Sequence, residues 1–210
     1  MKIGIDAREI QNGVVTGIGR SLANFLEYFE AHDQKHVLFL FSEKPLPMRF
    51  SDKIGQVVIP SCPTFFWDQV KLPLAIKAHG IDFFYSPYYK APMLTRTCTV
   101  NQVLDLMFLV FPLYRKKLGI LGRYYYAIFG RVFARKSVSI ITDSEHAKQD
   151  IIRLWRIEPE KIAVIPLGVG NRYLLRILNC SPGSERSLAC LIDMCFISVT
   201  SNLTKILSRS

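Results

Sequence analysis

The sequence lacks the long apolar stretches that would place it in a membrane or in the secretory pathway. Charged residues or prolines interrupt every apolar stretch before it reaches the roughly 18 residues that a membrane-spanning helix needs; Asp105 and Asp193 interrupt two of them. Lys2, Asp6 and Arg8 lie among the first residues, so the sequence predicts no secretory signal. We therefore expect a cytosolic protein without a transmembrane helix.

The cysteines of the chain lack any metal-binding arrangement. The chain has 5 cysteines in 210 residues. They show neither CxxC spacing nor a nearby pair of histidines, so no zinc site is indicated. Because their number is odd, a disulfide framework is not indicated either. Free thiols, no metal and no cofactor are predicted.

Acidic residues are absent between Leu106 and Thr142, although the formal net charge of the chain is +10. Such an excess favours an anionic partner, which is nucleic acid, acidic lipid or a phosphate-bearing substrate. No nucleic-acid-binding module is recognisable, so nucleic acid is not predicted. The basic residues of this stretch are Arg115, Lys116, Lys117, Arg123, Arg131, Arg135 and Lys136.

This basic stretch also contains a run of aromatic residues, and two interpretations stay open. In the first, the aromatic rings lie near lipid headgroups on the inner face of the membrane, and basic side chains are attracted to acidic lipid. The candidate membrane-surface residues are Arg115, Lys116, Lys117, Arg123 and Arg131. In the second, the stretch is a core-facing helix with a solvated basic face.

The hydrophobic pattern alternates between short apolar runs and segments with helical spacing. Strands are expected at Lys2 to Ala7, His36 to Phe41, Val57 to Ile59, Ile81 to Tyr85, Thr97 to Leu104, Ser139 to Asp143 and Ala163 to Ile165. Helices are expected at Ile18 to Phe29, Asp68 to His79, Leu118 to Ala134, and from the N-cap Ser144 towards Arg156. Strands that are apolar on both faces predict an α/β fold, a Rossmann-like parallel sheet with helices on both faces.

The pattern ends at about Val169. The segment 170–210 is rich in Ser, Leu and Cys and shows no sustained period of 2 or 3.6 residues. We expect residues 1–169 to form one domain followed by a divergent tail. A shifted reading frame or a gene fragment would produce such a change, and the DNA sequence of the locus tests that hypothesis.

Several segments, in order, resemble the N-terminal half of the GT4 family of retaining glycosyltransferases, particularly its bacterial surface-polysaccharide mannosyltransferase-like members. They are GIDAR at 4–8, GIGR at 17–20, WDQVKLP at 67–73, YSPYYKAP at 85–92, VLDL at 103–106, TDSEHAKQDI at 142–151 and EKIAVIPLGV at 160–169. The resemblance implies that residues 1–169 are one half of a GT-B fold, the N-terminal half that binds the acceptor.

The resemblance also implies a reaction, in which a hexosyl group passes from a nucleotide sugar to a glycan or lipid-linked glycan with retention of configuration. The family's donor domain carries a Glu-x7-Glu pair. Glu185 and Asp193 share its spacing, but too few residues surround them to build that domain. We expect a truncated chain that is inactive alone. The alternative is a non-catalytic module that binds the acceptor or a membrane.

The glycine-rich segment after the first predicted strand is a candidate phosphate site. Gly17 and Gly19 allow close approach of backbone amides, and the N-terminus of the following helix favours negative charge. The resemblance implies that this loop, with Arg20, lies beside the donor diphosphate and the acceptor. An ordinary glycine turn is the alternative. A dinucleotide fingerprint with Glu43 is disfavoured, since nine residues separate the strand from Gly17.

Further candidates for the acceptor side are Arg8, Ser86, Tyr88, Asp105 and Glu145. Each has a structural alternative: a solvated arginine for Arg8, packing for Ser86 and Tyr88, a helix N-cap for Asp105 and a helix-dipole partner for Glu145.

Relatives commonly carry a His-Asp pair where this chain has Leu104 and Asp105. Leucine neither hydrogen-bonds a sugar hydroxyl nor exchanges a proton, so the resemblance implies altered or lost activity. No catalytic residue is assigned.

Overall fold

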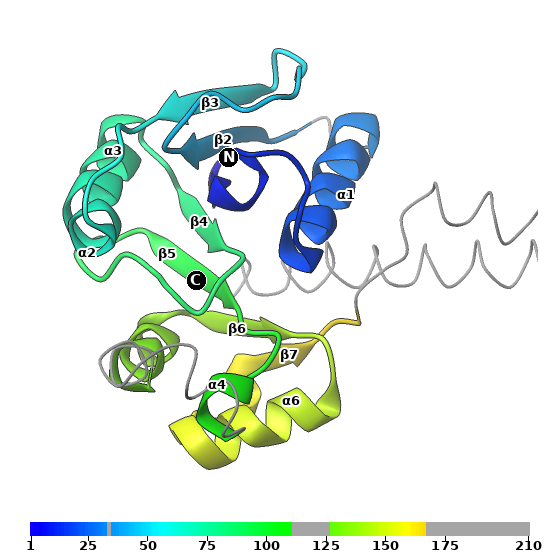
Figure 1. The fold of residues 1–210 in the computed structure, drawn as a ribbon, viewed down its shortest axis with the longest axis vertical. Coiled ribbons are helices and arrows are strands. Elements are labelled where there is room, and N and C mark those ends of the chain that lie inside the picture. The colour runs from blue at the N-terminus through cyan, green and yellow to red at the C-terminus, as the bar shows by residue number, and fades with distance from the viewer. Residues whose placement is uncertain (33–34, 111–126, 167–210) are drawn as a thin grey trace, which may run out of the picture.

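The computed structural model describes residues 1–32, 35–110 and 127–166, which are coloured in Figure 1. Within these residues, seven parallel strands form one sheet in the order β3-β2-β1-β4-β5-β6-β7. The strands are β1 (Lys2–Asp6), β2 (Val37–Ser42), β3 (Ile54–Val58), β4 (Phe83–Ser86), β5 (Cys98–Gln102), β6 (Ser139–Thr142) and β7 (Ile162–Val164). The expected parallel sheet is therefore confirmed.

Helices cover both faces of the sheet, as the pattern predicts (Figure 1). The described helices and helical turns are η1 (Arg8–Ile10), α1 (Gly17–His32), α2 (Thr64–Phe66), η2 (Trp67–Lys71), α3 (Leu72–Ala78), α4 (Met107–Val110), residues 127–136, α6 (Glu145–Asp150), η3 (Ile151–Trp155) and η4 (Pro159–Lys161). Among the helices of these described residues, none combines the length and the apolar character needed to cross a bilayer.

Alternation along β2 separates the two faces of the sheet. Leu38 and Leu40 join the core cluster that contains Leu22 and Leu26 of α1. Phe41 points to the other face and joins the cluster of α3 and η2. Because successive strand residues point to opposite faces, α1 lies on one face and α3 on the other.

The helix over residues 64–78 begins four residues earlier than the sequence predicts and contains a π turn. Pro73 has no N–H and its ring crowds the preceding turn, which an ordinary helix interior tolerates poorly. Here the backbone N–H of Leu72 bonds to the Trp67 carbonyl in the wider π spacing. The wider turn leaves three consecutive residues, Trp67, Asp68 and Gln69, buried. The pattern of a regular helix does not predict this.

The helix that follows β6 begins where the sequence predicts. The Ser144 hydroxyl accepts a hydrogen bond from the backbone N–H of Ala147 at 3.3 Å, which confirms Ser144 as the N-cap. The helix ends in the π turn η3, after which Arg156 has the positive φ of 53°. Gly80, with φ of 62°, ends α3 in the same conformation, as expected.

Most differences from the predicted bounds are one or two residues at strand ends. β3 is the exception, because it runs over Ile54–Val58 instead of Val57 to Ile59. It is an edge strand with alternating burial, so only some of its residues are apolar. Of the predicted helix over residues 118–134, the described part is helical. Residues 118–126 and the predicted tail, 170–210, lie outside the described residues.

Candidate functional site

The order in which the chain adds strands to the sheet reverses between β1 and β4. The chain builds β2 and β3 on one side of β1, and then crosses to add β4, β5, β6 and β7 on the other side. In open parallel sheets, ligands bind at the carboxyl ends of the strands at such a switch point. Asp6 ends β1 and Ser86 ends β4, so their surroundings are the first place to seek a site.

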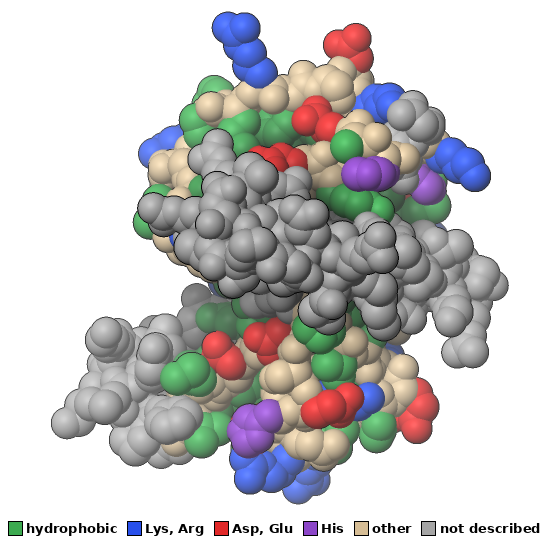
Figure 2. Space-filling view, turned by 90° about the vertical axis from the view of Figure 1, so that its right-hand side faces the viewer, with side chains coloured by type: hydrophobic (Ala, Val, Ile, Leu, Met, Phe, Trp, Pro, Cys, Tyr) green, Lys and Arg blue, Asp and Glu red, His purple; other side chains and the backbone are tan. Residues whose placement is uncertain are grey.

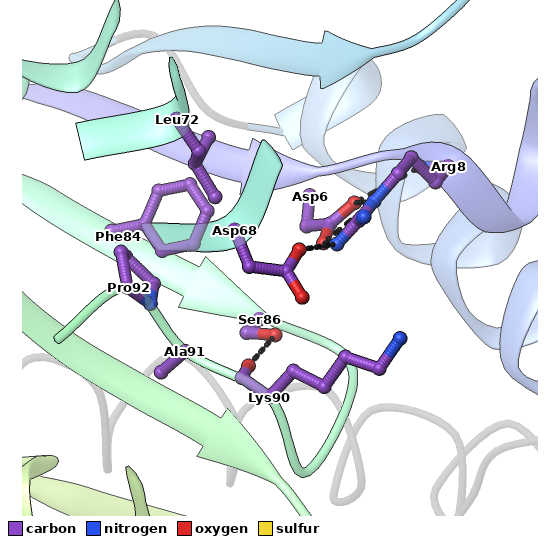
Figure 3. A pocket seen from close by; sticks show the side chains of 9 residues that line it. All are labelled: Asp6, Arg8, Asp68, Leu72, Phe84, Ser86, Lys90, Ala91 and Pro92. Atoms are coloured by element: carbon purple, nitrogen blue, oxygen red, sulfur yellow. Dashed lines mark hydrogen bonds and ion pairs between the residues drawn. The ribbon is translucent and has the colours of Figure 1, made fainter. Parts of the chain in front are cut away.

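A pocket occupies this position, and Figure 3 shows the side chains around it. Polar groups come from three parts of the chain: the end of β1, the π turn η2 and the loop after β4. The lining residues are Asp6, Arg8, Asp68, Leu72, Phe84, Ser86, Lys90, Ala91 and Pro92. The pocket is narrow and opens to solvent, and the empty space of about 160 Å³ around its lining includes part of that solvent.

Arg8 is held by two buried carboxylates. Its Nη2 lies 2.6 Å from Asp6 Oδ2 and 2.7 Å from Asp68 Oδ1, and its Nε lies 3.0 Å from Asp6 Oδ1. The guanidinium also stacks on the ring of Trp67, with its central carbon 3.8 Å from the ring centroid. This geometry uses the planar fork of arginine and fixes the end of β1 against η2.

Burial and neighbouring charges shift the pKa values of Arg8 and Asp68. Burial alone lowers the pKa of Arg8, but the charges and hydrogen bonds of Asp6 and Asp68 outweigh that effect and raise its pKa above the usual value. Burial raises the pKa of Asp68, although Arg8 and Lys90 lower it in part. Arg8 therefore stays charged, while the ionised form of Asp68 is less favourable than it would be in water.

The wall opposite the carboxylates is a loop that the buried side chain of Gln69 fixes in place. Gln69 Nε2 donates to the Ala91 carbonyl at 3.1 Å, and its Oε1 accepts from the backbone N–H of Met93 at 2.8 Å. The Ser86 hydroxyl donates to the Lys90 carbonyl at 2.5 Å. The Lys90 side chain thereby lines the pocket, and its Nζ lies 5.7 Å from the ring centroid of Tyr88.

The glycine loop lies beyond η1, and its two glycines differ. The Thr16 hydroxyl accepts from the backbone N–H of Gly19 at 2.9 Å and bonds to the Glu9 carboxylate. A Cβ on Gly19 would lie 2.9 Å from the Glu9 carbonyl oxygen, whereas nothing lies within 4 Å of a Cβ on Gly17. Gly19 is therefore required by close packing, and Gly17 is exposed at the start of α1.

The structure brings some of the predicted residues together and leaves others apart. Arg8 and Ser86 line the pocket. Tyr88 does not line it, but its ring contacts the ammonium group of Lys90, which does. Asp105 is exposed and accepts from the backbone N–H of Met107 at 2.9 Å, which is an Asx turn just before α4 rather than the N-cap geometry.

The remaining predicted residues lie away from the pocket lining or outside the described residues. Glu145 is exposed in the first turn of α6, and Arg20 is exposed on α1. Arg131 is half-buried in the helix over residues 127–136. Arg115, Lys116, Lys117 and Arg123 lie outside the described residues.

Sequence reasoning assigned no role to three charged residues of the pocket: Asp6, Asp68 and Lys90. A signal for the carboxylates was present, because Asp6 ends an apolar strand and Asp68 follows Trp67 in an apolar helix. Charged residues are almost never fully buried unless they are paired. That rule predicts a partner for each aspartate, but spacing alone does not identify Arg8 as the shared one.

Comparison with solved structures identifies the known fold that this chain resembles. WaaG, a glycosyltransferase involved in lipopolysaccharide biosynthesis, superposes with a TM-score of 0.55 at 13% identity, over 88% of this chain and 52% of WaaG. HepE from Anabaena, solved in complex with UDP, gives a TM-score of 0.50 at 13% identity, over 85% of this chain and 49% of HepE. At this identity the likeness shows the fold alone, which is one half of a GT-B fold.

The chain spans about half the length of the solved glycosyltransferases that it matches. No curated protein matches it by sequence. The model of Glycosyltransferase Family 4 matches residues 15–170, which is most of the chain. Together with the parallel sheet and its switch point, this match shows that the chain belongs to glycosyltransferase family 4.

Proposed function

We propose that this chain is the acceptor-side half of a retaining glycosyltransferase, which transfers a hexosyl group from a nucleotide sugar to a glycan or a lipid-linked glycan. The observation that carries the proposal is the polar pocket at the carboxyl ends of β1 and β4. Ligands of open parallel sheets bind at this edge, and the family match indicates glycosyl transfer as the chemistry.

The glycine loop is the proposed point of contact with the donor. Gly17 leaves open space beside the N-terminus of α1, where backbone N–H groups attract phosphate. Arg20 on the first turn adds positive charge. The UDP in the HepE structure supports a nucleotide diphosphate as the donor group. We propose that the rest of the donor site lies on a second lobe, since the chain spans about half of WaaG and HepE.

On the acceptor side, Ser86 and Tyr88 are the proposed contacts, and Arg8 orders the site without needing to touch the acceptor. Asp105 and Glu145 stay proposals for the rim of the cleft. No residue of this chain is proposed as catalytic. Mannosyl transfer in surface-polysaccharide synthesis is the proposed subtype, and it depends on the sequence resemblance alone.

Leu104 favours a second candidate, a module that binds acceptor glycans without turnover. Its side chain stands where relatives carry histidine, and leucine supplies no proton or hydrogen bond. Under either candidate we expect the isolated chain to bind glycans and to show little or no transfer.

A glycan array and a transfer assay test this function together. The purified chain is applied to arrayed bacterial and lipid-linked glycans, and is then incubated with a panel of nucleotide sugars and the glycans that bind. We expect binding without nucleotide release. Failure to bind any glycan would contradict the acceptor role, and turnover by the chain alone would contradict the proposed inactivity.

We further propose that the chain lies on the cytosolic face of an anionic membrane. Ile128 and Val132 are exposed, at 57% and 41%, on the helix that also carries Arg131, Arg135 and Lys136. An apolar stripe beside basic side chains suits the headgroup region.

Co-sedimentation with liposomes should require acidic lipid and weaken at high salt. Val132→Ser should weaken it, whereas Val58→Ser, equally exposed on β3, should not.

A further inference from the structure

One oxygen of the buried cluster has no partner. Asp68 is 1% exposed, and its Oδ1 accepts from Arg8, but its Oδ2 is buried without a hydrogen-bond donor among the described residues. Leaving a buried charged acceptor unsatisfied is unfavourable, and native structures do so rarely. This oxygen faces the pocket in Figure 3, on the side of the carboxylate away from Arg8.

The charges around the pocket determine what can satisfy Asp68 Oδ2. Two carboxylates, Asp6 and Asp68, face two cations, Arg8 and Lys90, so the lining is close to neutral. The hydrogen bonds of Arg8 point towards the carboxylates. An anionic phosphate in this pocket would therefore meet a carboxylate oxygen first, and like charges at this range repel strongly.

A neutral hydroxyl group fits these constraints. Its O–H donates to the carboxylate, and its oxygen accepts from a cationic donor such as the Lys90 ammonium group, which lines the same pocket. The lining residues leave little free space between them, so the pocket admits at most one hydroxyl group from the edge of a sugar ring, rather than a whole oligosaccharide.

We propose that Asp68 Oδ2 is a recognition point for the acceptor, at which one hydroxyl of a neutral sugar residue donates a hydrogen bond, with the loop from Ser86 to Lys90 forming the opposite wall. This inference rests on the proposed function, since it deepens the acceptor side of the same site. Arg8 is a positioning residue in it, because its bond to Oδ1 and its stacking on Trp67 fix the carboxylate.

Asp68→Asn is the sharpest variant for a test. Asparagine has the same shape, and its one carbonyl oxygen can still accept from Arg8. Its amide nitrogen then stands in the place of Oδ2 and donates where the native oxygen accepts. The variant therefore reverses the hydrogen-bonding role at one atom. Asp52→Asn removes a carboxylate from an exposed position and is the matched control.

The full chain and both variants are titrated with methyl manno-, gluco- and galactopyranosides and with inorganic phosphate, and saturation-transfer NMR measures binding. We expect at least one glycoside to bind, with a loss of about tenfold or more in Asp68→Asn and no loss in Asp52→Asn. Monodeoxy forms of the bound glycoside identify the hydroxyl. Removing it should weaken binding to the native chain but not to Asp68→Asn.

Equal affinity of the native chain and Asp68→Asn would overturn the proposal, and so would tighter binding of phosphate than of any glycoside, or no binding of any glycoside. The array experiment separates this failure from failure of the proposed function. Glycans that bind the native chain and Asp68→Asn equally would leave the acceptor role standing and remove only Asp68 from it. A melting curve of each variant confirms that it is folded.

Discussion

Two regions follow β1, and they are held in different ways. In the Arg8 cluster, formed by Asp6, Arg8 and Asp68, charged groups are buried and every described contact is short and directional. In the glycine loop, Thr16 and Gly19 are held by one cap and by close backbone packing, and Gly17 is open to solvent. The comparison indicates a rigid wall beside an accessible backbone, and under the proposed function the wall faces the acceptor and the backbone faces the donor.

The largest loss of folding stability is expected when the Arg8 cluster loses its arginine. Arg8→Met keeps an unbranched side chain over Trp67 but leaves two buried carboxylates without their partner. Removing one partner of a buried ion pair costs about 3–5 kcal/mol, and chemical denaturation measures it. Arg49→Met, at an exposed position, is the control. A loss below about 1 kcal/mol in Arg8→Met would show that the cluster is not the rigid region.

A smaller effect is expected from closing the tight turn of the glycine loop. In Gly19→Ala the new Cβ would lie 2.9 Å from the Glu9 carbonyl oxygen, and such overpacking costs about 1–3 kcal/mol. In Gly17→Ala the Cβ enters open space at the start of a helix, so stability should change by less than about 0.5 kcal/mol. Thermal unfolding of the pair checks the difference. Equal losses would contradict the described packing.

The Thr16 side chain, which caps the N-terminus of α1, should contribute still less to stability. Thr16→Val removes the acceptor of the Gly19 N–H bond and the contact to Glu9, at a cost of about 1 kcal/mol. Chemical denaturation of this variant gives the value. Glu9→Gln keeps the cap and is expected to lose less, so a larger loss in Glu9→Gln would assign the stability of the loop to the Glu9 contact.

The smallest effect on stability is expected at Asp68, and its sign depends on pH. Because burial raises the pKa of Asp68 in the folded chain, its carboxyl favours folding below the unfolded pKa of about 3.9, and this contribution is lost as pH rises through the folded pKa. Asp68→Asn should match the native chain in acid and become relatively more stable towards pH 7. Denaturation at several pH values tests this, and a relative loss at pH 7 would contradict it.

Much of the fold follows from local patterns in the sequence. Short apolar runs separated by helical periods predicted every described strand, and Ser144 and Gly80 marked helix ends that the structure confirms. These features depend on residues close together in the chain. β3 was placed less well, because the alternating burial of an edge strand leaves few apolar residues to detect.

The site was predicted only in part. Arg8 was identified because it flanks the glycine loop and Ser86 because it follows a strand, and both line the pocket. Asp68 was missed, because the pattern of a regular helix does not place it on the same side as Trp67 and Gln69. The π turn that accompanies Pro73 buries all three together, and the width of that turn depends on packing against the sheet.

The sequence by itself determined that strands alternate with helices in a parallel sheet, because apolar periodicity and helix caps act over a few residues. Only the tertiary structure decided that Asp68, 60 residues from Arg8 in the chain, shares its guanidinium with Asp6. The strand order, in which β1 lies between β2 and β4, brings these groups together. Burial then gives their pairing its strength, since water no longer screens the charges.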